Sequence, residues 1–246
     1  MNNKFVNINI DDLSHNFSEI SDCIKKYYPI GLTSEDENYF SYSGIVKLNE
    51  IIKKNSTVDY YEKEWNIGFL EKLKSNFSDV YGTTAGLVPN FSGVVRLKNT
   101  LESKTELHFY KSLIGNYFTI EVLENIHSKE ISHPLFGKRK IWAIENIIVS
   151  PVGDYEEVFL KVYQSIVDKY KEVKFLPYIF DLYKVNDLYV PYNSNNKEVT
   201  IAGAFFQKFS SYDESITIIG DINYHINRLK KDGDNGNSDN YLIINN

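Results

Sequence analysis

The chain has 246 residues, of which 42% are hydrophobic, 15% aromatic and 24% charged. This composition is typical of a globular protein and excludes wholesale disorder, a collagen-like repeat and a coiled coil. The formal net charge of −6 comes without the clustered Lys and Arg that phosphate contacts or an anionic membrane require, so we expect no nucleic-acid partner and no membrane partner.

The N-terminal part of the chain is predicted to be mainly helical. A short strand is expected over residues 5–10, followed by a helix that begins at Asp11 or Asp12 and ends before Pro29. Ser43 and Gly44 open a second helix over residues 45–52. A third helix, over residues 59–77, is predicted from apolar residues spaced four apart, namely Trp65, Phe69, Leu73 and Phe77.

From residue 91 to residue 150 the chain becomes rich in β-branched and aromatic residues. Strands are predicted near 94–97, 107–110, 117–122 and 141–149, with turns such as Gly115-Asn116 between them. A helix follows over residues 154–170, with Asp154 and Glu157 as a capping box.

The rest of the chain is more mixed. Strands are predicted around the turn at Asn186-Asp187 and over residues 216–222, and residues 223–231 are predicted to form a short last helix. Residues 199–209 favour neither a helix nor a strand. Residues 232–240 contain almost only Asp, Asn, Gly and Ser, which indicates a flexible tail over 232–246.

This order of elements indicates the α+β class. We expect a mainly antiparallel sheet with helices packed on one face, because regular β-α-β alternation is absent. Residues 1–231 are predicted to form one domain, with a helix-rich part over 1–90 and a strand-rich part over 91–231. Residues 43–48 resemble residues 92–97, which leaves open a duplication of 43–76 and 92–125.

The chain lacks the short motifs that mark common nucleotide, zinc-protease and serine-hydrolase sites, so we expect no cofactor and no metal. Cys23 is the only cysteine, which excludes an intrachain disulfide, and we expect it to be structural. The first 17 residues contain no apolar stretch typical of a secretory signal, so we expect a cytoplasmic protein.

The basic cluster Lys138-Arg139-Lys140 follows a predicted turn. We expect it to belong to a solvated hairpin, because three charges are too few for a nucleic-acid groove.

Histidine and glutamate residues of the strand region offer one alternative, an enzyme. Because side chains alternate along a strand, Glu106 and His108 are expected to lie on the same face and could act as an acid–base pair. Glu121 and Glu145 are other possible partners of His108, and His127, His133 and Glu130 complete the set of candidate metal ligands.

Two segments that combine acidic and aromatic residues carry the main prediction, a surface that binds another protein. Tyrosine supplies large contact areas at interfaces, and carboxylates beside it steer a basic partner. The candidate partner-binding residues are Glu35, Asp36, Glu37, Tyr39, Tyr42, Asp181, Tyr183, Asp187, Tyr189 and Tyr192.

We therefore expect a non-catalytic, cytoplasmic protein-binding domain. In size, charge and absence of catalytic motifs the chain is similar to bacterial immunity proteins. That similarity implies a basic toxin as the partner, for example a nuclease, whose active site this chain would occlude.

Overall fold

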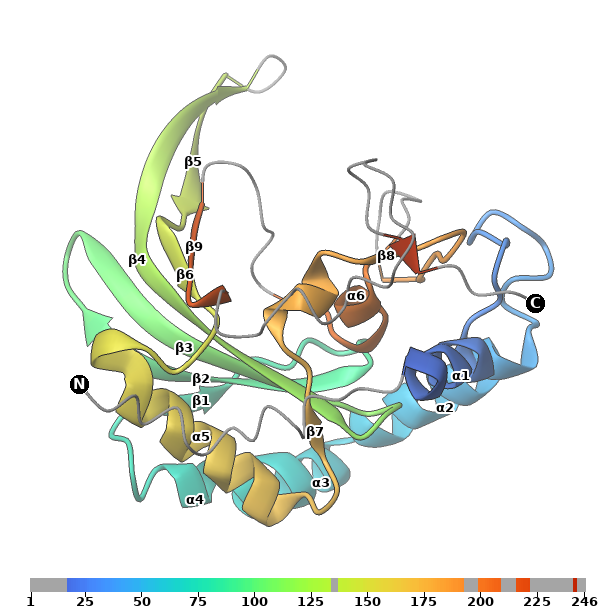
Figure 1. Cartoon of the computed structure of the whole chain (residues 1–246), viewed down its shortest axis with the longest axis horizontal. Helices are drawn as coiled ribbons and strands as arrows, with labels where there is room; N and C mark the ends of the chain where they lie inside the picture. Colours follow the sequence, from blue (N-terminus) through green and yellow to red (C-terminus); the bar gives the residue numbers. More distant parts are fainter. Residues whose placement is uncertain (1–16, 134–136, 193–198, 209–215, 222–240, 243–246) are drawn as a thin grey trace, which may run out of the picture.

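A curved, mostly antiparallel sheet organises the molecule (Figure 1). The structure is a computed structural model that describes residues 17–133, 137–192, 199–208, 216–221 and 241–242. The eight-stranded sheet has the order β1-β2-β3-β4-β6-β9, and β5 and β7 also pair with β4. Its strands are β1 (Val80–Gly82), β2 (Asn90–Asn99), β3 (Ser103–Ser112), β4 (Tyr117–His133), β5 (Gly137–Ala143), β6 (Asn146–Ile148), β7 (Lys174–Phe175) and β9 (Thr217–Ile219).

The strand β4 is the longest of these and holds the sheet together. One of its edges pairs with β3, and the other pairs in turn with β7, β6 and β5. Asn125, at φ 53°, lies where the register between β3 and β4 shifts, so the strand bends there. Beyond His127, β4 leaves β3 and continues with β5 as a two-stranded ribbon, which Figure 1 shows projecting from the body.

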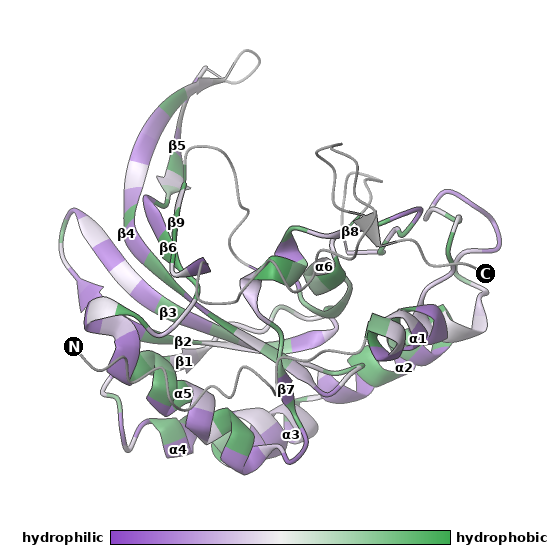
Figure 2. Ribbon diagram, in the orientation of Figure 1, coloured by the Kyte–Doolittle hydropathy of each residue, from purple (hydrophilic) through white to green (hydrophobic). Residues whose placement is uncertain are grey.

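The convex face of the sheet is covered by helices. These are α5 (Glu156–Lys169) and a continuous helical stretch made of α3 (Val58–Tyr61), the π-helical segment Glu62–Leu70 and α4 (Glu71–Leu73). Trp65 stacks on Phe91 with 5.0 Å between ring centroids, and Phe69 meets Phe109 edge to face. Hydrophobic residues alternate with hydrophilic ones along α5 (Figure 2), and Phe159, Val162 and Ile166 are buried in the same core.

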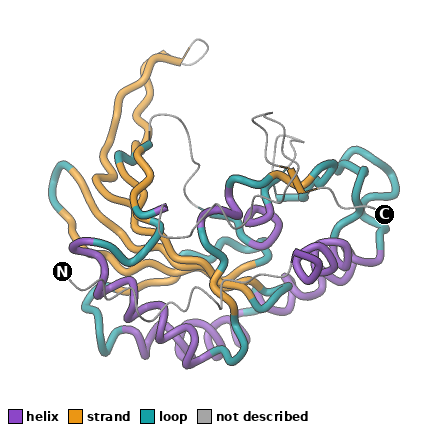
Figure 3. The backbone as a smooth tube through the Cα atoms, in the orientation of Figure 1, coloured by secondary structure: helices purple, strands orange, loops and turns teal. Residues whose placement is uncertain are grey.

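A second core lies on the other side of the sheet, at one end. It is formed by α1 (Phe17–Tyr27), α2 (Ser43–Asn55), α6 (Ile201–Phe205) and a 3-10 turn at Tyr178–Asp181. The β3–β4 hairpin contributes Tyr110, Ile114 and Tyr117 to this core. Figure 3 shows these helices joined by long loops, alongside the small parallel pair β8 (Lys184–Val185) and β10 (Tyr241–Leu242).

The predicted α+β class and the mainly antiparallel sheet are confirmed. The helices expected over 45–52, 59–77 and 154–170 are present with shifted ends. The capping box at Asp154 and Glu157 is wrong, because Asp154 lies inside a 3-10 turn and the helix begins after Tyr155 without a side-chain cap. Glu157 instead pairs with Lys161.

The suggested duplication has no counterpart in the fold. Residues 43–55 form helix α2, whereas residues 90–99, at the matching position of the second segment, form strand β2. The strand expected at 5–10, the start of the first helix and the helix at 223–231 lie outside the described residues. So does the tail at 232–246, apart from the two residues of β10. Among the described residues, no helix is both long and apolar enough to cross a membrane.

Candidate functional site

Polar side chains line the concave face of the sheet along β3. Leu107 and Phe109 point to the core under the helices, so Glu106, His108 and Tyr110 point the opposite way. Their cross-strand neighbours are Arg96, Val94 and Ser92 on β2 and Leu123, Glu121 and Thr119 on β4. Glu106, His108 and Tyr110 are all buried, although a sheet face in this position is usually apolar.

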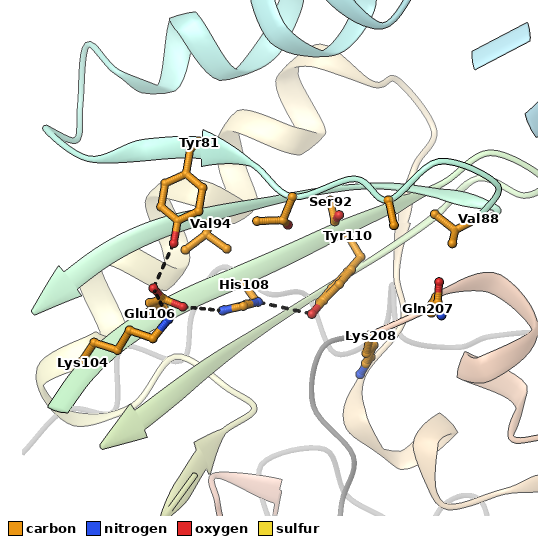
Figure 4. Close-up of a pocket in the computed structure, with 12 residues that line it drawn as sticks. Tyr81, Val88, Ser92, Val94, Lys104, Glu106, His108, Tyr110, Gln207 and Lys208 are labelled. Atoms are coloured by element: carbon orange, nitrogen blue, oxygen red, sulfur yellow. Dashed lines mark hydrogen bonds and ion pairs between the residues drawn. The ribbon is translucent and has the colours of Figure 1, made fainter. Parts of the chain in front are cut away.

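A cavity of about 320 Å³ lies over this face (Figure 4). Its floor comes from β2 and β3, and its rim from the loop after β1 and from the two residues that follow α6 closely, Gln207 and Lys208. The lining residues are Tyr81, Thr83, Ala85, Val88, Ser92, Val94, Lys104, Glu106, His108, Tyr110, Gln207 and Lys208. Polar groups and small apolar side chains therefore share the wall.

Glu106 is the centre of the charged network beneath the cavity. Its Oε1 receives a hydrogen bond from the Tyr81 hydroxyl at 2.9 Å and lies 3.1 Å from the Lys104 ammonium. Arg96 Nε lies 3.4 Å from the same oxygen, and the Arg96 guanidinium also reaches Asp79 at 3.1 Å. Burial alone would raise the pKa of Glu106, but hydrogen bonds from His108, Lys104 and Tyr81 outweigh it and lower this pKa to about 2.

His108 links this carboxylate to Tyr110. Its Nε2 is 3.1 Å from Glu106 Oε2, and its Nδ1 is 3.4 Å from the Tyr110 hydroxyl. A carboxylate can only accept, so His108 donates to Glu106 from Nε2, and the single hydroxyl proton of Tyr110 can serve either His108 Nδ1 or Glu121 Oε1. Glu106 thus fixes the tautomer and the orientation of the imidazole, and the Tyr110 hydroxyl is the group at the far end of this chain.

A second set of buried charges continues from Tyr110. The Tyr110 hydroxyl lies 3.5 Å from Glu121 Oε1, and the other oxygen of Glu121 lies 3.4 Å from the Lys208 ammonium. Lys208 also binds Asp181 at 2.6 Å. Burial lowers the pKa of Lys208, but Asp181 and Glu121 overcome this and leave it raised. The polar array therefore runs from Arg96 to Asp181 across three strands, the segment after α6 and the 3-10 turn at Tyr178–Asp181.

This arrangement can bind a polar molecule and exchange a proton with it. Glu106 stays ionised at neutral pH because its pKa is about 2, so it cannot serve as the proton carrier. It can instead orient His108, as a carboxylate orients the histidine of a catalytic triad. His108 and Tyr110 are the other polar side chains of β3 that face the cavity, and Lys104 and Lys208 lie at two sides of it.

The two acidic and aromatic segments lie side by side, and Asp181 connects the second of them to the cavity residue Lys208. The Tyr39 hydroxyl donates to the Tyr189 carbonyl at 2.8 Å, and Gly31 N–H donates to the Asp187 carbonyl at 2.9 Å. Glu35, Asp36, Glu37 and Asp187 are exposed, and the carboxylate of Asp36 binds the backbone and hydroxyl of Thr33.

Several side chains of these segments lie in the interior. The Tyr39 ring is buried, and burial raises the pKa of Tyr39. The Tyr192 hydroxyl binds Tyr28, the Tyr42 hydroxyl donates to the Lys25 carbonyl, and the half-buried Tyr183 ring packs on Phe17. Asp181 belongs to the buried ion pair with Lys208. The tyrosines therefore pack the second core, and Asp181 belongs to the polar array. The surface that these segments expose consists mainly of Glu35, Asp36 and Glu37, here called the acidic loop.

Other candidates from the sequence are dispersed. His127 Nδ1 lies 2.9 Å from the Asn125 carbonyl and 3.9 Å from Glu145, and Glu130 pairs with Lys138 on the ribbon. Within the described part of the chain, no group of three or more His, Cys, Asp or Glu side chains is placed to hold a metal ion. Cys23 is half-buried, and its thiol donates to the Ile114 carbonyl at 3.2 Å.

The comparisons add no relative. No protein-family model, curated protein or solved structure matches this chain. Function therefore has to be argued from the site itself.

Sequence reasoning found part of the cavity and missed the rest. Side chains alternate between the two faces of a strand, and this rule places Glu106 and His108 on one face. The same rule could have added Lys104 and Tyr110 to the candidate residues. Lys208 and Gln207 lie in the segment that favoured neither helix nor strand, and no local pattern links them to β3.

Proposed function

We propose that the protein binds a small polar molecule in the cavity over β3, with His108 and Tyr110 as its proton-exchanging groups. The observation that carries this proposal is the row of alternate side chains Glu106, His108 and Tyr110, all buried and all facing one cavity. Burying polar groups is costly unless they are satisfied, and here they are linked to one another beneath an open space. The cavity volume of about 320 Å³ is at the lower end of the range of small-molecule sites.

The lining indicates the chemical class of the ligand. Lys104, Lys208 and Gln207 offer donors, so the ligand should carry an acceptor such as a carboxylate or carbonyl. Val88 and Val94 form an apolar wall that suits a short hydrocarbon part.

Thermal denaturation with a panel of small carboxylic acids, amino acids and sugars tests this proposal. A ligand of the cavity should raise the melting temperature of the wild type, because it binds the folded state alone. Tyr110→Phe removes one hydrogen-bonding group and should weaken binding of that ligand about tenfold. Tyr42→Phe, which removes a hydroxyl far from the cavity, serves as the matched control. If the panel gives no stabilising compound, or if both variants bind equally well, the proposal is wrong.

A second candidate function is protein binding through the acidic loop. It is favoured by the exposure of Glu35, Asp36 and Glu37 beside Phe40, whose side chain is 54% exposed. On this proposal the protein is a cytoplasmic bacterial immunity protein, and the loop docks on a basic toxin. Exposed aromatic side chains are enriched at the centres of protein interfaces, and polar side chains surround them at the rims.

Co-expression with the product of the adjacent reading frame tests this second function. Protection of the host cell should be lost in the double variant Glu35→Lys, Glu37→Lys, because the steering charge is reversed. The double variant Glu50→Lys, Glu71→Lys makes the same change in charge on exposed helical positions and should still protect. Equal protection by both double variants would exclude the loop as the docking site.

A further inference from the structure

The β4–β5 ribbon carries an excess of positive charge on a negatively charged protein. Residues 128–142 contain Lys129, Lys138, Arg139 and Lys140 against one acidic residue, Glu130, which is a net charge of +3. With −6 for the whole chain, the remainder carries −9. The ribbon therefore attracts anions that the rest of the surface repels.

Exposed apolar side chains accompany this charge. Trp142 is 62% exposed and Ile141 is 40% exposed, although both lie on a strand. The Lys104 ammonium sits 5.3 Å from the centroid of the Trp142 ring, which places a further cation at the base of the ribbon. Trp is among the residues most enriched at the centres of protein interfaces.

The ribbon also has a backbone edge that pairs with no other described strand. Past Ser103↔His127, where the pairing of β3 with β4 ends, β4 continues only with β5 among the described strands. β5 likewise has β4 as its one described neighbour, so the outer N–H and C=O groups of Gly137–Ala143 form an edge. A two-stranded ribbon with both faces exposed buries little apolar surface, so it is only marginally stable by itself. A third strand along its edge would stabilise it.

We propose that the β4–β5 ribbon binds an acidic, extended segment of a partner protein, which adds as a strand along β5. An open strand edge can be used by another backbone, which a nucleic acid or a lipid does not offer. Carboxylates of the segment pair with Lys138 and Lys140 on the face that also carries Trp142, and its apolar side chains cover Ile141 on the other face. The charge of −9 on the rest of the protein disfavours a long polyanion such as duplex DNA and tolerates a short acidic segment.

Tryptophan fluorescence measures this binding directly. The protein has two tryptophans, Trp65 with 0% exposure and Trp142 with 62% exposure, so acrylamide quenching reports mainly on Trp142. The probe is a synthetic peptide of alternating Glu and Val that is as long as β5. We expect the peptide to protect Trp142 from acrylamide in a saturable way, and more strongly at low salt.

Charge-reversal variants test the role of the ribbon. Lys138→Glu with Lys140→Glu should raise the Kd of the peptide about tenfold or more. Lys47→Glu with Lys53→Glu changes the net charge equally at exposed positions on α2 and should leave the Kd within about twofold. An equal loss of binding in both double variants would show that only net charge matters and would overturn the proposal.

Two probes need no variant and so do not depend on how a variant folds. A peptide of the same sequence with every backbone nitrogen methylated has no N–H group to donate to a ladder, and we expect it to leave Trp142 open to acrylamide. If it protects Trp142 as well as the unmodified peptide does, strand addition is excluded. Tighter binding of a DNA duplex, or of vesicles that contain phosphatidylserine, would assign the ribbon to that partner and overturn the proposal.

Discussion

Glu106 shows how one buried carboxylate can be kept charged inside a sheet. Its side chain is only 3% exposed, yet it faces Arg96, Lys104 and His108 and accepts from Tyr81. Since removing an ion from water is costly, each of these contacts is needed to offset the loss of hydration. The residue therefore contributes to stability and to the orientation of His108 at the same time.

The stability contributed by Glu106 should depend on pH. Its pKa of about 2 in the folded protein lies below the ordinary value of 4.5, so ionisation favours the folded state. Glu106→Gln should lower the free energy of unfolding at neutral pH by about 2 kcal/mol. The difference from the wild type should be constant above about pH 5 and vanish as the pH falls from 4.5 toward 2.

Urea denaturation of both proteins over a series of pH values measures this difference. A difference in the free energy of unfolding that is unchanged at pH 2, or absent at pH 7, would contradict an ionised Glu106 in the folded protein.

Lys208 should matter more than any lysine on the surface. Its ammonium is 3.4 Å from Glu121 and 2.6 Å from Asp181, and both carboxylates are nearly inaccessible to water. Lys208→Met keeps most of the side-chain volume but removes a buried positive charge, so we expect a loss of about 3–5 kcal/mol in the free energy of unfolding. Chemical denaturation at neutral pH gives this value.

The matched control is Lys161→Met, which breaks an exposed pair with Glu157. Exposed pairs contribute less than about 1 kcal/mol, so this variant should unfold close to the wild type. Comparable losses in the two variants would mean that Lys208 is not bound as described.

The residue pairs differ in how far the sequence predicts them. Glu106 and His108 are two positions apart on a strand, so alternation alone places them together. Lys208 is 87 positions from Glu121 in the sequence, and only the tertiary fold brings the two side chains within 3.4 Å. Burial of Tyr39 and Asp181 depends on the same long-range packing, which composition cannot reveal.

At the scale of elements, the helical stretch before β1 contains a π-helical segment, Glu62–Leu70. The wider π-helical turn keeps Trp65 and Phe69 on the sheet, where both are buried. It also brings the backbone at Gly68 very close to the Lys63 carbonyl, because a Cβ at this position would lie 2.5 Å from that oxygen. Glycine is thus required here for steric reasons.

Gly68→Ala should therefore destabilise the protein, although the same change in an ordinary helix stabilises it by about 0.5–1 kcal/mol. We expect a loss of about 1–3 kcal/mol, because backbone atoms must move to accept the methyl group. Thermal denaturation followed by circular dichroism tests the sign. Gly86→Ala is the control, since a Cβ at Gly86 meets nothing within 4 Å. An increase in melting temperature for Gly68→Ala would argue against the π-helical segment.

Elements with long apolar stripes were the most predictable. The helices over 43–55 and 156–169 and the strands β2, β3 and β4 follow their periodicity. Strands β7 and β8 are only two residues long, so their own sequences carry little signal, whereas β9 lies within the strand expected over 216–222. The failed cap at Asp154 has a similar cause: a 3-10 turn at Gly153–Tyr155, with Gly153 at φ 57°, precedes the helix.

At the scale of the whole molecule, two cores share one sheet. One lies under α5 and the π-helical segment, and the other joins α1, α2 and α6 to the end of the β3–β4 hairpin. The β3–β4 hairpin connects them, because Phe109 and Phe118 lie in the first core whereas Tyr110 and Tyr117 lie in the second. The Cys23 thiol on α1 donates to the Ile114 carbonyl in the turn of this hairpin. Loss of either core should therefore loosen the other.

The reactivity of Cys23 should report on this coupling. Burial raises the pKa of its thiol to about 11, so the thiolate is scarce in the folded protein at pH 8. We expect a thiol reagent to label Cys23 only as fast as the protein opens. In a urea series the labelling rate should rise in parallel with the loss of Trp65 fluorescence, as for a single cooperative domain.

Rapid labelling at urea concentrations where Trp65 is still native would show that α1 opens by itself. In that case residues 17–55 behave as a separate helical unit, and the predicted single domain is wrong.

The strand β4 has 17 residues, and its partner strands become available at different times while the chain is being synthesised. Strands β2 to β6 follow one another in the chain and can pair as soon as they leave the ribosome. The partners that lie beside them in parallel, β7 and β9, are completed only at Phe175 and Ile219. Until then the growing chain exposes the edge of β6 and its buried residues Ile147 and Ile148. A nascent chain halted before Ile219 is thus the form of this protein most exposed to aggregation and most dependent on chaperones.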